Sequence, residues 1–189
     1  NVLKNGVVAQ KDADKIVDFI DITIDDRGIT KNRILMLDIL ANNDWKRPIY
    51  FTGGASADEE YIWLKDYLQL DGLAFKLVPI KTPTKYVDES GRQREVTLFD
   101  IGRIDADKMY ANINKLEWRN INNGEIYLDE QTKRNAISLR NSLMRLSNAF
   151  AIEGDTIKAV EVLDLSLDKM PIEKFDHYSL SLEYPKMCY

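Results

Sequence analysis

Apolar and charged residues alternate over residues 16–24, where several of the apolar side chains are β-branched. This period of two predicts a half-buried strand. Short apolar runs at 47–52 and 73–80 predict two more strands, and apolar residues spaced three and four apart predict helices over 31–43 and 57–70. Because strands and helices alternate in this order, the pattern favours an α/β fold with a mixed, mostly parallel sheet and flanking helices.

The rest of the chain has the pattern of a β-hairpin followed by helices. Residues 84–99 are typical of two short strands around a bend, and residues 105–116 are typical of a helix. After the polar loop that follows, the apolar spacing is helical throughout. We therefore expect an α/β domain at 1–125 and a helical region at 126–189.

The helical region contains a pattern that is similar to a tetratricopeptide repeat, a helix–turn–helix unit of about 34 residues. Placed over residues 140–173, the repeat puts Gly154 at the turn, the small Ala159 at the close helix contact and Pro171 at the terminating proline. Glycine and proline end helices, so these positions predict a helical hairpin. A second unit begins next and stops partway, so we expect a truncated C-terminal end and any oligomer to form through residues 174–189.

Composition narrows the classes of function. The chain carries 26 Lys and Arg against 31 Asp and Glu, a net charge of −5, which disfavours nucleic-acid binding because that affinity comes from clustered basic residues. His177 and Cys188 are the single histidine and cysteine, so one chain can form neither a His/Cys zinc site nor an internal disulfide. We expect no metal and no cofactor. No run approaches the ~20 apolar residues that cross a bilayer, and a start at Asn1 without a signal pattern leads us to expect a piece of a longer protein.

Gly53, Gly54 and Ser56 lie between the predicted strand at 47–52 and the predicted helix after it. A turn in this place can present backbone N–H groups to an anion. The alternative is a purely structural turn in which Ser56 caps the helix, and the sequence lacks the Gly-Lys-Ser/Thr of a phosphate-binding loop. Both interpretations stay open, and this turn is the candidate for a small-ligand contact.

Asp38 lies within the densest apolar stretch of the chain, at residues 34–40. A carboxylate among apolar side chains must find a partner or shift its pKa toward neutrality. Arg33 or Arg47 could supply a structural ion pair. The alternative is that Asp38 and Arg47 contact a ligand, because perturbed carboxylates cluster at functional sites.

Three stretches taken together resemble a known family. They run from Leu37 to Phe51, where the last residues are Asn-Asn-Asp-Trp-Lys-Arg-Pro-Ile-Tyr-Phe, then over 67–80, and then over 102–110 with Gly-Arg-Ile-Asp-Ala-Asp-Lys-Met-Tyr. The chain resembles the C-terminal soluble region of a bacterial membrane-protein family, the protein O-mannosyltransferase-like family known as domain of unknown function 2723. The likeness extends from about Val7 through the helical hairpin.

The resemblance implies a longer protein, in which an N-terminal membrane part with several spans precedes this region. That membrane part resembles glycosyltransferases that use lipid-linked sugars. Their acidic catalytic residues lie in loops of the membrane part, so no catalytic residue maps onto this chain. The resemblance also implies a position at the periplasmic face of the bacterial inner membrane.

One leading hypothesis and two alternatives follow. The leading hypothesis is a non-catalytic, extracytoplasmic accessory domain of a membrane glycosyltransferase, which positions an acceptor protein or glycan, or holds a partner, beside its own N-terminal membrane domain. The first alternative is a protein-interaction scaffold that uses the repeat-like hairpin. The second is a small stand-alone enzyme that uses carboxylates such as Asp38, with residues 53–56 as an anion cradle. Under the leading hypothesis this chain is not itself an enzyme.

Overall fold

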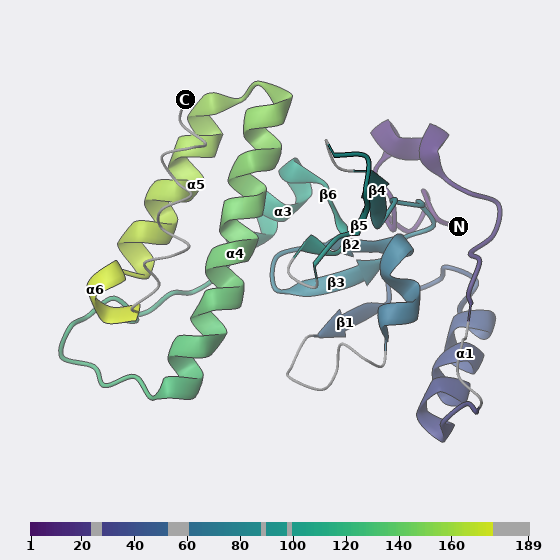
Figure 1. The fold of residues 1–189 in the computed structure, drawn as a ribbon, viewed down its shortest axis with the longest axis horizontal. Helices are drawn as coiled ribbons and strands as arrows, with labels where there is room; N and C mark the ends of the chain where they lie inside the picture. The colour runs from purple at the N-terminus through teal and green to yellow at the C-terminus, as the bar shows by residue number, and fades with distance from the viewer. Residues whose placement is uncertain (24–27, 53–60, 88–89, 98–99, 176–189) are drawn as a thin grey trace. The chain divides into compact units, whose positions relative to one another are not determined.

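A computed structural model of the chain describes residues 1–23, 28–52, 61–87, 90–97 and 100–175 (Figure 1). The fold is mixed α/β, as the sequence pattern predicts. The chain forms two compact units: the first contains residues 1–70 and 74–103, and the second contains residues 71–73 and the chain from Ile104 onward. These units divide the chain near residue 103, and the domain boundary expected near residue 125 stays a prediction.

The main sheet has four short strands that neighbour one another in the order β1 (Tyr50–Thr52), β3 (Ala74–Leu77), β2 (Leu68–Leu70) and β6 (Arg103–Ile104). Both β1 and β2 pair antiparallel with β3. The expectation of a mostly parallel sheet is therefore wrong, and the sheet is mostly antiparallel. The cause lies in residues 71–73, which turn from β2 to β3 through Gly72 at a φ of 99°. This connection is too short for the crossover that parallel strands need.

Residues 16–23 do not form a strand, so the strand predicted at 16–24 is wrong over its described part. The chain instead bends at Asp18 and Phe19 on its way from the 3₁₀ helix η1 (Gln10–Lys15) to the next helix. One backbone hydrogen bond fixes the start of this segment, from the N–H of Val17 to the carbonyl of Pro79 at 2.9 Å. The alternating pattern is present, but no described strand lies beside it.

Residues 31–43 form the predicted helix, α1 (Lys31–Asn43). Thr30 caps it as predicted, because its Oγ1 accepts the N–H of Arg33 at 3.4 Å. The helix predicted over 57–70 is confirmed only in part: Tyr61 is α-helical and η2 (Ile62–Tyr67) is a short 3₁₀ helix, but the next three residues belong to β2. The capping residues proposed for that helix lie in 53–60, outside the described residues.

The core of the first unit lies between η2 and the sheet. The aromatic rings of Phe51, Tyr61 and Phe75 pack together, with centroids 5.3 Å apart for the first pair and 6.0 Å for the second. The fully enclosed apolar side chains around them are Tyr61, Leu64, Tyr67, Leu68, Leu77 and Ile101. Burial of these side chains contributes about 25 cal/mol per Å² of apolar surface removed from water, which is the main stabilising term for such a unit.

The strand residues Gln69 and Lys76 alternate with the apolar core residues, so they face the other side of the sheet. Both are buried. There the N-terminal segment covers them: Lys76 Nζ donates to the carbonyl of Gly6 at 3.0 Å, and Arg103 joins Gln69 Oε1 at 3.3 Å to Asp12 Oδ2 at 2.7 Å. A polar network therefore holds the first residues of the chain to the sheet.

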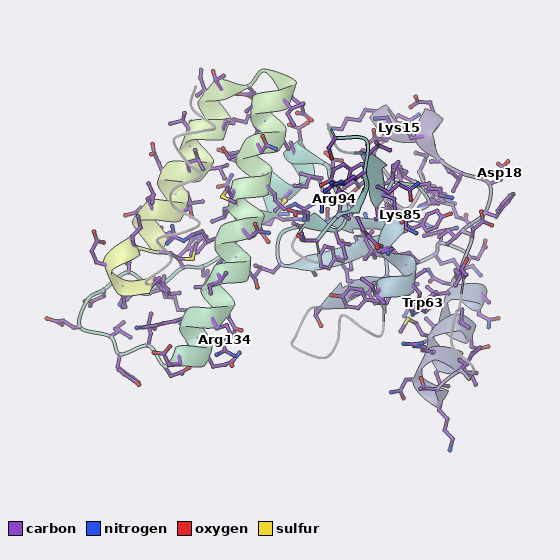
Figure 2. All side chains as sticks on the ribbon, in the orientation of Figure 1. Lys15, Asp18, Trp63, Lys85, Arg94 and Arg134 are labelled. Atoms are coloured by element: carbon purple, nitrogen blue, oxygen red, sulfur yellow. The ribbon has the colours of Figure 1, made fainter. Side chains whose placement is uncertain are left out.

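Residues 84–99 contain the predicted hairpin, in which β4 (Lys85–Val87) pairs antiparallel with β5 (Gln93–Glu95). All of its strand residues are exposed. Lys65 binds Glu95 of this hairpin in an ion pair. Figure 2 labels Lys85 and Arg94 on the two strands.

The second unit is helical. Its helices are α3 (Ala106–Ile113), α4 (Glu130–Glu153), α5 (Thr156–Lys169) and α6 (Ile172–Phe175). α4 and α5 lie side by side as a hairpin (Figure 1). Its turn is at Gly154, in the left-handed conformation with a φ of 86°, so the predicted corner is confirmed. Ser147 Oγ donates to the carbonyl of Ala159 at 2.8 Å, which brings the helices close together at two small residues.

Candidate functional site

Three of the predicted site residues, Gly53, Gly54 and Ser56, lie outside the described residues. The proposed anion cradle at this turn therefore stays a prediction. His177 and Cys188 lie outside the described residues as well.

Asp38 and Arg47 are both exposed in the structure. The side-chain amide of Asn42 donates to Asp38 Oδ1 at 3.0 Å, and neither arginine considered from the sequence takes that place. The carbonyl of Arg47 accepts the side-chain amide of Asn43 at 2.7 Å. The Asp38 carboxylate therefore has a local partner, whereas the bond at Arg47 involves only its backbone, and a ligand role for these two residues stays a prediction.

A different feature stands out in the first unit: an apolar cavity of about 590 Å³ between α1 and residues 16–22, here called the first hollow. Its volume lies in the range of about 300–1,000 Å³ that is usual for ligand pockets. Two carboxylates, Asp18 and Asp44, stand among the residues that line it. The apolar walls come from residues that include Val17, Ile20, Leu37, Leu40, Trp45 and Leu77.

The wall at Trp45 is built by an unusual turn. Asp44 and Trp45 follow one another with φ values of 48° and 56°, in the left-handed region that non-glycine residues rarely adopt. Asn1 Nδ2 donates to the carbonyl of Asp44 at 3.0 Å and to its Oδ2 at 2.9 Å, and Asn5 Nδ2 donates to the carbonyl of Trp45 at 2.8 Å. Such strain persists only where the surroundings hold it, and it clusters at functional sites.

A second hollow of about 320 Å³ lies beside the same segment. It shares Ile16, Val17, Asp18 and Phe19 with the first hollow and adds residues that include Tyr67 and Lys81. Residues 16–19 therefore line both cavities. Figure 2 labels Asp18 on this stretch, between η1 and α1.

The charges around the first hollow are mostly negative. Neither lysine nor arginine is among the described residues that line it. Lys46 Nζ lies 4.0 Å from Asp44 Oδ2, and both side chains are largely exposed. This ion pair therefore contributes little free energy. Asp18 is exposed and has no ionic partner among the described residues. The first hollow thus combines apolar walls with carboxylates that a cationic group can approach.

The polar network beneath the N-terminal segment is a structural support for this region. Burial raises the pKa of Asp12, but the hydrogen bonds and charges of Lys15 and Arg103 lower it by more, so the net pKa lies below its usual value. Asp12 accepts from Lys15 Nζ at 2.6 Å as well as from Arg103. It therefore stays ionised and anchored at neutral pH.

Sequence reasoning missed Asp18, Asp44 and Trp45 as site residues. One signal was available: Asn-Asn-Asp-Trp forms part of the stretch that carries the family resemblance. Asp and Asn are also the non-glycine residues that tolerate a left-handed backbone best, which points to a turn at Asp44.

The model of the TMEM260-associated domain 2 matches residues 1–108, more than half of the chain. The chain belongs to this family. The TMEM260-associated domain 2 match covers the whole of the first unit, including both hollows, and ends at the beginning of α3. The family's description associates the domain with a membrane protein family. No curated protein and no solved structure matches the chain.

No helix among the described residues combines the length and the apolar character needed to cross a bilayer. The described residues likewise contain no group of three or more His, Cys, Asp or Glu side chains placed to hold a metal ion.

Proposed function

We propose that this chain is a non-catalytic accessory region of a membrane glycosyltransferase of the O-mannosyltransferase-like kind, and that it positions an acceptor or holds a partner polypeptide. The observation that supports the proposal is an overlap between the family match and the residues of the first hollow. The family match at residues 1–108 covers the same residues that build the first hollow and its strained turn. A feature that lies within the family's own domain is the best candidate for what that domain does.

The proposal also assigns a place in the cell. As an accessory region of such a protein, the chain lies at the periplasmic face of the bacterial inner membrane, next to its own N-terminal membrane domain. The family resemblance in the stretches at 37–51, 67–80 and 102–110 supports this assignment. The association of the matched domain with a membrane protein family agrees with it.

A second candidate function, a protein-interaction scaffold, is favoured by one observation on α5. Ile157, Val160 and Leu167 are exposed, and their spacing of three and seven residues places them on one side of the helix. Such a stripe is typical of a helix that packs on a neighbouring repeat. A tetratricopeptide type for the α4–α5 hairpin belongs to this candidate.

The test uses the full-length membrane protein, with and without residues 1–189, in an assay of sugar transfer to polypeptide acceptors. We expect deletion to lower transfer and to change acceptor choice. A second deletion that removes 126–189 alone separates the two candidates, because it leaves the first unit intact. If both deletions leave transfer and acceptor choice unchanged, the accessory function is wrong.

A further inference from the structure

In the segment at residues 16–22, beside the first hollow, several backbone groups have no hydrogen-bond partner among the residues that the structure describes. The N–H of Val17 donates to Pro79, and the N–H of Asp21 donates to Tyr67 Oη at 3.1 Å. Between and after these two anchors, the backbone groups of Asp18, Phe19, Ile20 and Ile22 form no hydrogen bond with the described residues. Backbone N–H and C=O groups bond to something in nearly all folded proteins, and a bound ligand can supply partners for such groups.

The sequence of this segment is that of a strand, although the chain does not use it as one. Its β-branched, alternating residues fit a pleated, half-buried surface. An extended peptide can bind through its main chain, as in strand addition to a sheet edge, where main-chain hydrogen bonds give affinity and side-chain pockets give specificity. The first hollow supplies such a pocket directly beside the segment.

We propose that residues 18–22 and the first hollow bind an extended polypeptide segment in which apolar and basic residues alternate. The apolar side chains enter the hollow against Leu37, Leu40 and Trp45, and the basic side chains lie near Asp18 and Asp44. Charge complementarity selects this occupant, because both ionisable groups that line the first hollow are carboxylates. Lys81 faces the second hollow and not the first.

A polypeptide fits these observations better than a small amphiphilic cation. Both offer an apolar body and a positive charge, which satisfy the walls and the two carboxylates. Only the polypeptide also has N–H and C=O groups that can pair with the backbone groups of residues 18–20 and 22, which have no partner within the described part of the chain. This inference rests on the proposed function, since the bound segment is the acceptor or partner that the accessory role requires.

The test is direct binding to the isolated chain. The probe is a fluorescently labelled short peptide that alternates lysine and valine, and the control peptide alternates glutamate and valine. We expect saturable binding of the lysine peptide by fluorescence anisotropy, weakened by added salt, and no binding of the glutamate peptide. In a chain with Trp63→Phe and Trp118→Phe, the emission of Trp45 reports whether the probe reaches the hollow.

Matched variants locate the site. Leu37 lines the hollow, so Leu37→Trp fills it, and we expect about tenfold weaker binding, equal to about 1.4 kcal/mol. Leu35 is on the same helix, exposed and outside the hollow, so Leu35→Trp is the control and leaves binding unchanged. Asp18→Asn weakens binding about threefold, as the loss of an exposed ion pair does, whereas Asp14→Asn, also exposed, has no effect.

Three outcomes overturn the inference: no binding of the lysine peptide at millimolar concentration, equal binding of the glutamate peptide, or equal binding by Leu37→Trp and Leu35→Trp. Dodecylammonium is the non-peptide probe. If it binds as tightly as the peptide and shows the same dependence on the variants, the backbone part of the proposal is wrong. If peptide binding fails while the deletion of residues 1–189 still changes acceptor choice, the proposed function stands without this inference.

Discussion

At the scale of single residues, Asp12 ties the N-terminal segment to the sheet through Arg103. Asp12 is only 2% exposed and receives hydrogen bonds from two cations. Its folded-state pKa is lowered below the ordinary value of 3.8, so its stabilising contribution is present above that pH. The contribution is lost as the pH falls through the folded-state pKa.

We expect Asp12→Asn to lower the free energy of unfolding by about 2 kcal/mol at pH 7, because it leaves a half-buried arginine without its charged partner. The difference from the unsubstituted chain should shrink as the pH falls below 4, where the carboxylate becomes protonated. Urea unfolding at a series of pH values measures this. Asp14→Asn, an exposed neighbour, should show neither effect. A difference that stays constant down to pH 2 would show that the ion pair is not its source.

Gly102 is the residue at which the sheet most clearly excludes a side chain. Its φ is 84°, and a Cβ there would lie 3.2 Å from Phe75 Cδ1 and 3.3 Å from the carbonyl oxygen of Leu68. Gly91 has a similar φ of 76° but open space around it. Gly102→Ala should therefore lower the free energy of unfolding by about 3 kcal/mol, from both strain and close contact, and Gly91→Ala by only about 1 kcal/mol from strain. Thermal unfolding compares the two, and equal losses would contradict the close contact.

At the scale of elements, the hairpin of α4 and α5 encloses the charged side chain of an arginine. Arg140 is fully buried and donates through Nη2 to the carbonyl of Met170 at the end of α5. Its Nε and Nη1 have no acceptor among the residues that the structure describes. A buried guanidinium stays charged, so its desolvation costs several kcal/mol unless an anion compensates it.

We expect Arg140→Met to raise the free energy of unfolding by about 1 kcal/mol, because it removes this desolvation cost and gives up one hydrogen bond. Arg134→Met is the control on the same helix, where the side chain is exposed (Figure 2), and it should change little. Chemical denaturation of the isolated chain measures both. If Arg140→Met instead lowers stability by more than about 2 kcal/mol, an anion pairs with the guanidinium in solution.

The elements also show what sequence patterns can and cannot predict. α1 and the turn at Gly154 were predictable, because a cap, a helical spacing and a glycine are local signals. The direction of the sheet was not, because three-residue strands such as β2 carry almost no periodicity and the turn at residues 71–73 decides the pairing. The turn at Asp44 and Trp45 depends on Asn5, which is 40 residues from Trp45, and no local pattern reveals that bond.

At the scale of the whole molecule, the two units are built by contacts of different range. The second unit relies on neighbours in sequence: α5 follows α4 directly, and their contact at Ser147 and Ala159 spans 12 residues. The first unit is held together by contacts between residues that are far apart in sequence, such as Gly6 and Lys76, which are 70 residues apart. Local contacts form quickly and distant ones slowly, so the two units differ in how they reach their native state.

The ion pair between Asp12 and Arg103 can form only late in the synthesis of this region. The two residues are 91 positions apart, so at about 5–20 residues per second the ribosome needs roughly 5 to 18 s to supply the arginine after the aspartate. For most of that interval, until residues 78–80 have been made, Val7 and Val8 lack the Val78 and Ile80 side chains against which the finished fold buries them. These residues must therefore wait for their partners, and a chaperone that binds nascent chains would protect them during this delay.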